Sequence, residues 1–189
     1  MKKKIAIFIS GRGSNMEAIV KNTRDGILTD CCEVSVVVSD KSNSKGLETA
    51  QSCNIPTLCV ESKGKSRHDF EEELINALSP FQVDFIVLAG FMRMLSKTFL
   101  TAYNHKIINI HPADTKEFQG LHAYEWAFHS KKESTKITVH YVDEGMDTGT
   151  IIAQREVDLR GAKSLQEVER RGLKVEHQFY SEVLRKIFK

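Results

Sequence analysis

The chain has 189 residues, of which 41% are hydrophobic and 28% charged, a length and balance typical of one soluble globular domain. The formal net charge of +2 at pH 7 is too small to make nucleic acid the expected main partner. The first apolar run, Ile5 to Ile9, stops at Ser10 and is too short for a signal peptide or a membrane span.

The cysteines are few and are not spaced as metal ligands. They lie at positions 31, 32, 53 and 59, and no two of them form a C-x-x-C pair. This pattern predicts reduced thiols in a cytoplasmic protein rather than a disulfide framework or a zinc site.

The first half of the chain alternates short apolar runs with helical patterns. Strands are predicted over residues 4–10, 34–39, 57–60 and 85–89, and helices over 15–22, 47–53 and 68–77. The β-branched run from Val34 to Ser39 is typical of a strand buried on both faces. Strands separated by helices of this length predict an α/β fold with a mostly parallel sheet and helices on both of its faces.

The second half departs from this alternation. A strand is predicted over residues 107–110, two further strands over 136–142 and 151–157, and a long terminal helix over 164–188. The two later strands flank an acidic loop and are expected to pair antiparallel. Gly172 lies inside the predicted terminal helix and is expected to interrupt or bend it.

A glycine-containing loop, Ser10 to Asn15, joins the first predicted strand to the first predicted helix. Helix N-terminal N–H groups and the helix dipole converge there, so the loop predicts a phosphate site. Two alternatives stay open. One is an incomplete dinucleotide motif, with Met16 at the third glycine position and Asp40 as the ribose-binding acid. The other is a helix cap, in which Ser14 or Asn15 only satisfies the first turn.

The stretch from Asn109 to Pro112 is the strongest chemical signal. Alternation along a strand places Asn109 and His111 on one face, and Pro112 ends the strand because it has no N–H to donate. An acidic loop, Asp143 to Gly149, follows downstream. An amide donor, an imidazole and a carboxylate are the groups needed for acyl transfer. The alternative is that His111 only tethers its loop.

The remaining histidines give weaker signals. A metal site would have to gather His111, His122, His140 and Asp147, but no close-spaced ligand pair supports one, so no metal is expected. We expect His140, in a strand, to be packed. His68, His105 and His129 lie in polar surroundings and are expected to be exposed.

Several motifs in one order along the chain resemble a known family. They are Ile9 to Asn15, Ala89 to Ser96, Asn109 to Pro112, Gly120 to Ala123, Val139 to Val142, Asp147 to Ile152, and Glu176 with His177. Together they are similar to the phosphoribosylglycinamide formyltransferases, folate-dependent enzymes of purine biosynthesis, over essentially the whole chain. Methionyl-tRNA formyltransferase and formyltetrahydrofolate hydrolase share the Asn-x-His-Pro core, but each carries an additional domain for which we expect no room here.

The resemblance implies one Rossmann-like formyltransferase domain over residues 1–189, with a phosphate-binding half (1–100) and a catalytic and folate-loop half (101–189). It implies that 10-formyltetrahydrofolate is a cosubstrate and that no prosthetic group is needed. The implied catalytic residues are Asn109, His111 and Asp147. The implied ribonucleotide-binding residues are Gly13, Ser14, Asn15 and Glu176. The implied folate-binding residues are Arg67, Met92, Arg93, Met94, Leu95, Asn109, Asp143, Glu144 and Gly145.

The implied chemistry assigns a task to each catalytic residue. Asn109 and protonated His111 would donate hydrogen bonds to the formyl oxygen as negative charge grows there. The Asp147 carboxylate would favour the charged form of the imidazole and so act to raise the pKa of His111.

The chain departs from the family pattern directly after Pro112. The family usually continues with Ser-Leu-Leu-Pro, whereas this chain has Ala113 to Phe118. On the terminal helix, Leu173 stands where the family often has a basic or amide residue. We hypothesise that Lys116 supplies the missing charge for the ribonucleotide phosphate; the alternative is a solvated loop lysine.

Two rival functions stay open at this stage. The altered loop is compatible with a formyltransferase for another amine, and the glycine loop with a non-catalytic nucleotide-binding protein. In the main reading the partners are small-molecule substrates, with no nucleic acid or membrane, and the protein is a monomer or a homodimer.

Overall fold

The computed structural model describes residues 1–104 and 106–189, so the expectation for His105 lies outside the described residues. The strands are β1 (Lys3–Ile9), β2 (Cys32–Ser39), β3 (Thr57–Cys59), β4 (Phe85–Leu88), β5 (Ile107–His111), β6 (Ser134–Tyr141) and β7 (Ile151–Asp158). The helices are α1 (Ser14–Asp25), α2 (Lys45–Ser52), α3 (Arg67–Leu78), α4 (Lys97–Ala102), α5 (Ala123–His129) and α6 (Leu165–Phe188), with a 3-10 turn η1 (Ser79–Phe81).

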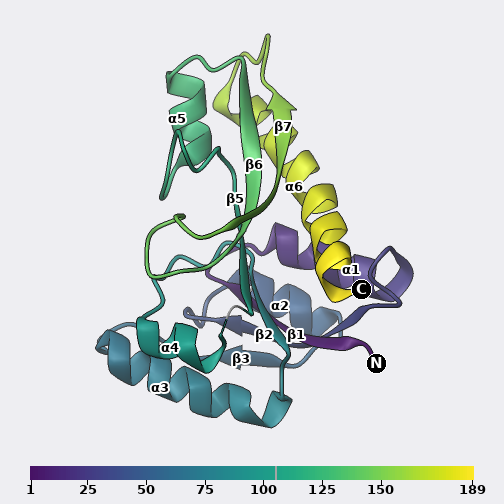
Figure 1. Cartoon of the computed structure of the whole chain (residues 1–189), viewed down its shortest axis with the longest axis vertical. Coiled ribbons are helices and arrows are strands. Elements are labelled where there is room, and N and C mark those ends of the chain that lie inside the picture. Colours follow the sequence, from purple (N-terminus) through teal and green to yellow (C-terminus); the bar gives the residue numbers. More distant parts are fainter. Residues whose placement is uncertain (105) are drawn as a thin grey trace.

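The described strands form one sheet of order β3-β2-β1-β4-β5-β6-β7 (Figure 1). Neighbouring strands from β3 to β5 are parallel, while β6 pairs antiparallel with both β5 and β7. The predicted mostly parallel sheet with an antiparallel C-terminal part is confirmed. The order reverses at β1, whose neighbours are β2 and β4, and open α/β sheets bind ligands beside such a reversal.

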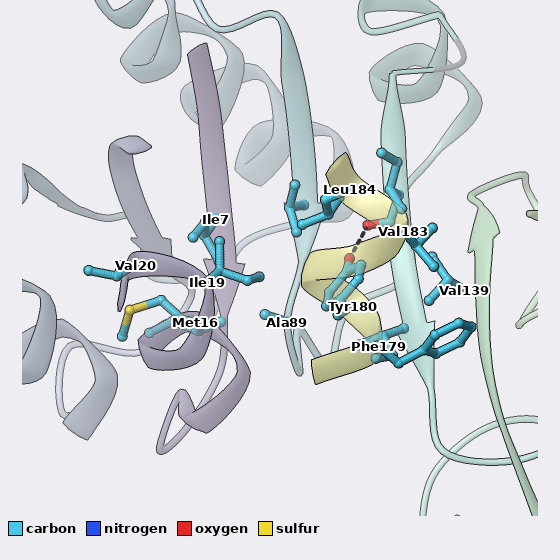
Figure 2. Packing of buried hydrophobic residues seen from close by; sticks show 14 of the residues in the cluster. Ile7, Met16, Ile19, Val20, Ala89, Val139, Phe179, Tyr180, Val183 and Leu184 are labelled. Carbon is cyan, nitrogen blue, oxygen red and sulfur yellow. Dashed lines mark hydrogen bonds between the residues drawn. The ribbon is translucent and has the colours of Figure 1, made fainter. Parts of the chain in front are cut away.

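The core lies on both faces of the sheet because side chains alternate along β1. Ile5, Ile7 and Ile9 pack on the face covered by α1, α2, α5 and α6. Ala6 and Phe8 pack on the opposite face, against α3 and α4. Figure 2 shows Ile7 close to Met16 and Ile19 of α1 on the first of these faces. Burial on both faces explains the continuous apolar runs of β1 and β2, and the predicted coverage of both faces by helices is confirmed.

The observed elements differ from the prediction mainly in two short helices. α4 and α5 were not predicted, because six and seven residues give too little helical periodicity to be recognised. The N-cap of α5 is His122, whose φ of 67° is left-handed and whose side chain makes no capping hydrogen bond. The predicted interruption at Gly172 is wrong, since α6 is continuous from Leu165 to Phe188. Among the described residues, no helix combines the length and apolar character that a membrane span requires.

A buried tyrosine connects the terminal helix to the sheet beside the carboxyl ends of two strands. The Tyr180 hydroxyl lies 2.9 Å from the Leu88 carbonyl oxygen and 3.0 Å from that of Ile108, and it donates its proton to this pair. Figure 2 shows Tyr180 and one hydrogen bond from its hydroxyl. Leu88 ends β4, and Ile108 precedes Asn109 on β5. Tyr180, Leu88 and Ile108 are all buried, so water has little access to either carbonyl.

Tyr180→Phe should lower the free energy of unfolding by about 1–2 kcal/mol, because it leaves buried acceptors without their donor. Urea denaturation of wild type and variant measures the difference. Tyr103→Phe, at the end of α4, is the matched control and should change stability by less than about 0.5 kcal/mol. Equal effects of the two substitutions would show that the Tyr180 hydrogen bond contributes nothing special.

Candidate active site

A pocket of about 350 Å³ lies at the carboxyl ends of β4 and β5, beside the start of α1. Residues from five separated parts of the chain line it: Asn15; Leu88 and Gly90 to Leu95; Asn109 to Pro112 and Gly120 to Ala123; His140, Val142, Asp143 and Gly145 to Asp147; and Glu176. Its place beside the reversal of strand order is the usual ligand position in open α/β sheets.

The three predicted catalytic residues meet on one side of this pocket. The His111 Nδ1 atom lies 3.2 Å from Asp147 Oδ2, and the Asn109 Nδ2 group donates to Asp147 Oδ1 at 3.3 Å. The Gly120 N–H donates to Asp147 Oδ2 at 2.8 Å. Asp147 thus holds the amide and the imidazole side by side at the end of β5.

Local turn chemistry delivers Asp147 to this position. Asp143 Oδ1 accepts hydrogen bonds from the Gly145 N–H at 3.1 Å and from the Thr148 hydroxyl at 2.7 Å, which closes the loop on itself. Asp147 has a left-handed φ of 54°, which aspartate tolerates better than most residues. At Gly149 a Cβ would stand 1.7 Å from the Tyr141 carbonyl oxygen, so only glycine allows the loop to return to β7.

The amide and imidazole donors already have protein acceptors. The His111 Nε2 atom lies 3.0 Å from the Phe118 carbonyl oxygen, and the Asn109 Nδ2 group lies 3.1 Å from His140 Nε2. His140 Nδ1 faces the Tyr141 carbonyl at 2.9 Å, so in the neutral ring Nδ1 carries the proton and Nε2 accepts from Asn109. A substrate oxygen must therefore share or replace one of these acceptors.

Burial, more than the neighbouring carboxylate, sets the charge of His111. Desolvation lowers the pKa of His111 below its usual value of 6.5, although Asp147 and the Phe118 carbonyl act to raise it. Asp147 acts on the pKa of His111 in the predicted direction, but the side chain is almost fully enclosed, and burial disfavours the cation more than Asp147 favours it. Burial also acts to raise the pKa of Asp147, but contacts with His140, the Gly120 N–H and His111 outweigh it and lower the pKa, so the carboxylate is ionised at neutral pH.

The lowered pKa of His111 has a consequence for stability. Between the folded pKa and 6.5 the unfolded chain binds the proton more readily, so the free energy of unfolding should rise with pH across that window. His111→Gln removes this titration and should flatten the slope. Urea denaturation of both proteins from about pH 5 to about pH 7.5 measures the two slopes. Identical slopes would contradict the lowered pKa.

The lining of the pocket also includes a buried carboxylate on α6, Glu176, which two donors hold. Asn15 Nδ2 donates to Glu176 Oε2 at 2.5 Å, and the Tyr124 hydroxyl donates to Glu176 Oε1. The helix-cap alternative is therefore wrong for Asn15, since Gly13 is the N-cap and no side chain caps α1. Asn15 Oδ1 is buried without a described partner, which leaves an acceptor for an N–H group of a ligand beside Glu176.

Gly172 is a close-packing position for Tyr124. A Cβ at Gly172 would stand 2.2 Å from the Tyr124 hydroxyl oxygen. Gly172→Ala should therefore lower the free energy of unfolding by about 1–3 kcal/mol through overpacking. At a helix position with free space, the same change would stabilise the helix by about 1 kcal/mol.

A double-mutant cycle on stability tests this interpretation. In a Tyr124→Ala background the same Gly172→Ala change should be neutral or stabilising, because the ring that it strikes is gone. A stabilising effect of Gly172→Ala in the wild-type background would contradict the close approach.

The segment from Gly90 to Leu95 forms an apolar wall of the pocket and is fixed at both ends. At the first end the Gly90 carbonyl oxygen accepts from the Ser10 N–H at 2.9 Å, and the Met92 N–H donates to the Ser10 hydroxyl at 2.9 Å. Just past the other end the Ser96 N–H donates to the buried Glu71 carboxylate at 2.7 Å. Met92, Leu121 and Met146 line the pocket and are at least half exposed. Exposed apolar side chains gathered at one pocket are suited to a flat ring system.

Some predicted site residues lie outside the lining of this pocket. Gly13 and Ser14 directly precede Asn15, and Glu144 is an exposed side chain between the lining residues Asp143 and Gly145. Arg67 is exposed at the start of α3. Lys116 is exposed and lines a separate open cavity with Thr148 and Ile151. Its position gives no support to the phosphate hypothesis.

The residues of the dinucleotide alternative and of the metal-site alternative do not come together in the structure. Asp40 is buried, accepts from the Ser62 hydroxyl at 3.3 Å and is absent from the pocket lining, so it is not placed as a ribose-binding acid. His122 Nδ1 faces Glu125 at 2.9 Å rather than joining His111 and His140. Among the described residues, no group of three or more His, Cys, Asp or Glu side chains is arranged to hold a metal ion.

Sequence reasoning missed Glu71, Tyr124 and the place of His140 in the site. His140 was predicted to be packed; it is buried, yet it also contacts Asn109. The antiparallel register that sets Asn109 opposite His140 is the only signal that could have found it, and register cannot be read from one strand.

The fold and the site together define an α/β enzyme equipped for acyl transfer, with an amide and an imidazole held by one carboxylate at a strand end. The sequence model of the family described as formyl transferase matches residues 3–184, so the chain belongs to the formyl transferase family.

Characterised relatives are similar over nearly the whole chain. A phosphoribosylglycinamide formyltransferase of Bacillus subtilis is 40% identical over 98% of this chain and 94% of its own length. The human trifunctional purine biosynthetic protein adenosine-3 is 34% identical over 97% of this chain, which spans 18% of that protein. The crystal structure of glycinamide ribonucleotide transformylase 1 from Geobacillus kaustophilus superimposes with a TM-score of 0.94 at 39% identity, covering 100% of both chains.

Proposed function

We propose that the protein transfers the formyl group of 10-formyltetrahydrofolate to the amine of glycinamide ribonucleotide in de novo purine biosynthesis. The products are formylglycinamide ribonucleotide and tetrahydrofolate. The cluster of Asn109, His111 and Asp147 carries this proposal, because it lies in one pocket with an apolar wall and a buried carboxylate. The names of the Bacillus and Geobacillus relatives support the same reaction.

The pocket has a suitable environment for each substrate. The Met92 to Leu95 segment and the loop at Asp143 and Gly145 would enclose the pterin, and Glu176 would bind near the glycinamide amine. The N–H groups at the start of α1, from Gly13 to Asn15, would hold the phosphate. Such groups lie at the positive end of the helix dipole, which favours an anion. Because the Asn15 side-chain amide donates to Glu176, Asn15 would bind the phosphate through its backbone N–H.

The chemistry follows from this arrangement. The amine attacks the formyl carbon, a C–N bond forms, and negative charge grows on the formyl oxygen. A hydrogen bond from Asn109 or from the His111 cation to that oxygen is worth about 3–4 kcal/mol in the transition state. The growing oxyanion also favours the protonated imidazole and so opposes the effect of burial on the pKa of His111. The proton of the amine passes to the departing folate nitrogen, and the bond between that nitrogen and the formyl carbon breaks.

Turnover with defined amines tests the substrate assignment. The protein is mixed with 10-formyltetrahydrofolate and glycinamide ribonucleotide, and deformylated folate is followed by absorbance. Rapid turnover with this amine is expected, and little with a nucleotide-linked amino sugar. Turnover with the amino sugar alone would favour the formyltransferase for another amine, which the altered loop Ala113 to Phe118 keeps in view.

The wider setting is part of the same proposal. We place the activity in the cytoplasm, on small-molecule substrates without nucleic acid, in a monomer or a homodimer. The phosphate-binding half would comprise residues 1–100, and the catalytic and folate-loop half residues 101–189.

A further inference from the structure

The loop that departs from the family pattern is built around a buried carboxylate. Ala113, Asp114 and Thr115 are all nearly inaccessible to solvent, and Asp114 is only 8% exposed. A buried carboxylate costs free energy unless charged or polar partners compensate it. Its partners therefore show what holds the loop.

Two strands and the loop itself supply those partners. Lys136 Nζ from β6 donates to Asp114 Oδ2 at 2.7 Å, and Gln154 Nε2 from β7 donates to Oδ1 at 3.1 Å. The Lys116 N–H also donates to Oδ1 at 3.1 Å. These contacts, led by that of Lys136, lower the pKa of Asp114 below its usual 3.8, so the carboxylate is charged across the working pH range.

The loop connects Asp114 to the imidazole of the active site. The Asp114 carbonyl oxygen accepts from the N–H groups of Glu117 and Phe118, both at 2.9 Å. The Phe118 carbonyl oxygen in turn lies 3.0 Å from His111 Nε2. The residues in this series are joined by direct hydrogen bonds. Asp114 is the loop residue in the series whose side chain is bound by both β6 and β7.

We propose that Asp114, held by Lys136 and Gln154, is a positioning residue that sets His111 for formyl transfer through the carbonyl of Phe118. The inference deepens the proposed function and rests on it for the kinetic part of the test. It assigns to this chain a polar anchor for the loop at a place where the family pattern has leucine.

The charge of His111 provides a readout that needs no substrate. Contact with the Phe118 carbonyl raises the pKa of His111, so a displaced carbonyl should lower that pKa further. The ionisable groups that face His111 are Asp147, His140 and Glu176, and none of them belongs to the loop at Asp114. A change in the titration of His111 on altering Asp114 would therefore arise through the loop.

The experiment compares Asp114→Ala and Asp114→Asn with Asp158→Asn. Asp158 is the matched control, because it is an aspartate in an ion pair, with Arg160, but exposed on β7. Titration of the imidazole resonances by NMR, with His111 assigned from His111→Gln, should show a lower pKa for His111 in Asp114→Ala and no change in Asp158→Asn. Asp114→Asn keeps an acceptor for Gln154 but loses the charge, so its shift should be intermediate.

Kinetics supply the second readout. Asp114→Ala should reduce kcat about 10- to 100-fold, as expected for a displaced catalytic group, with both KM values changed less than about twofold. Lys136→Met leaves Asp114 in place and should reproduce the direction of these effects if Asp114→Ala folds poorly. A variant that melts earlier but keeps the kcat and the His111 titration of the wild type would overturn the proposal, as would a change in KM alone. Failure of the wild type to formylate glycinamide ribonucleotide would count against the proposed function, while the NMR titration would still decide the role of Asp114.

Discussion

His111→Ala should lower kcat for formyl transfer by about 10³-fold, with far smaller changes in the KM for either substrate. The imidazole is the only group in the cluster that can place a full positive charge beside the growing oxyanion. It is enclosed, with 4% of its surface exposed, so water cannot replace it with the same geometry. Steady-state kinetics with 10-formyltetrahydrofolate and glycinamide ribonucleotide measure the loss.

The matched control for this experiment is His129→Ala at the exposed end of α5. It should leave kcat within about twofold of the wild type, because an exposed surface side chain away from the pocket contributes little. If His111→Ala retained more than about a tenth of the wild-type kcat, the mechanism built on the imidazole would be rejected.

Asp147→Asn should lower kcat about 10²-fold, because it removes the charge that opposes the effect of burial on His111. The amide keeps the size of the side chain and an acceptor for the Gly120 N–H, so the loop should stay in place. The pKa of His111 should fall further below 6.5. The alkaline limb of the pH profile of kcat should then move to lower pH, since the active imidazole is the protonated form.

The pH profiles of wild type and variant measure this displacement. Asp30→Asn is the control: Asp30 pairs with Arg185 and Lys189, away from the pocket, and its loss should not move the limb. A reduced kcat with an unmoved limb would mean that Asp147 only orients its neighbours and does not tune the charge of His111.

The framework of the fold could be predicted because it depends on local patterns. The apolar run of β1 and the β-branched run of β2 are strands buried on both faces. Each predicted strand begins and ends within two residues of the observed strand. The placement of Asn109 and His111 on one face followed from strand alternation alone. Short helices such as α5 have too little periodicity to be predicted, and the N-cap of α5 has an unusual φ that the sequence does not indicate.

The parts of the site that could not be predicted depend on contacts between distant positions. Asn15 meets Glu176 across the whole chain, and Glu71 reaches Ser96 from another helix. No local pattern encodes such pairs. The net direction of the His111 pKa shift could not be predicted for a related reason, since the sequence shows a charge partner in Asp147 but not the degree of enclosure that outweighs it.

The most direct test of the central claim follows the formyl carbon itself. The protein is incubated with glycinamide ribonucleotide and 10-formyltetrahydrofolate labelled with ¹³C in the formyl group, and the ribonucleotide is recovered for mass spectrometry and NMR. The account predicts that the label appears as an N-formyl group on the glycinamide amine, at a rate that His111→Ala lowers by about 10³-fold. Label released as formate, with the ribonucleotide unchanged, would contradict it.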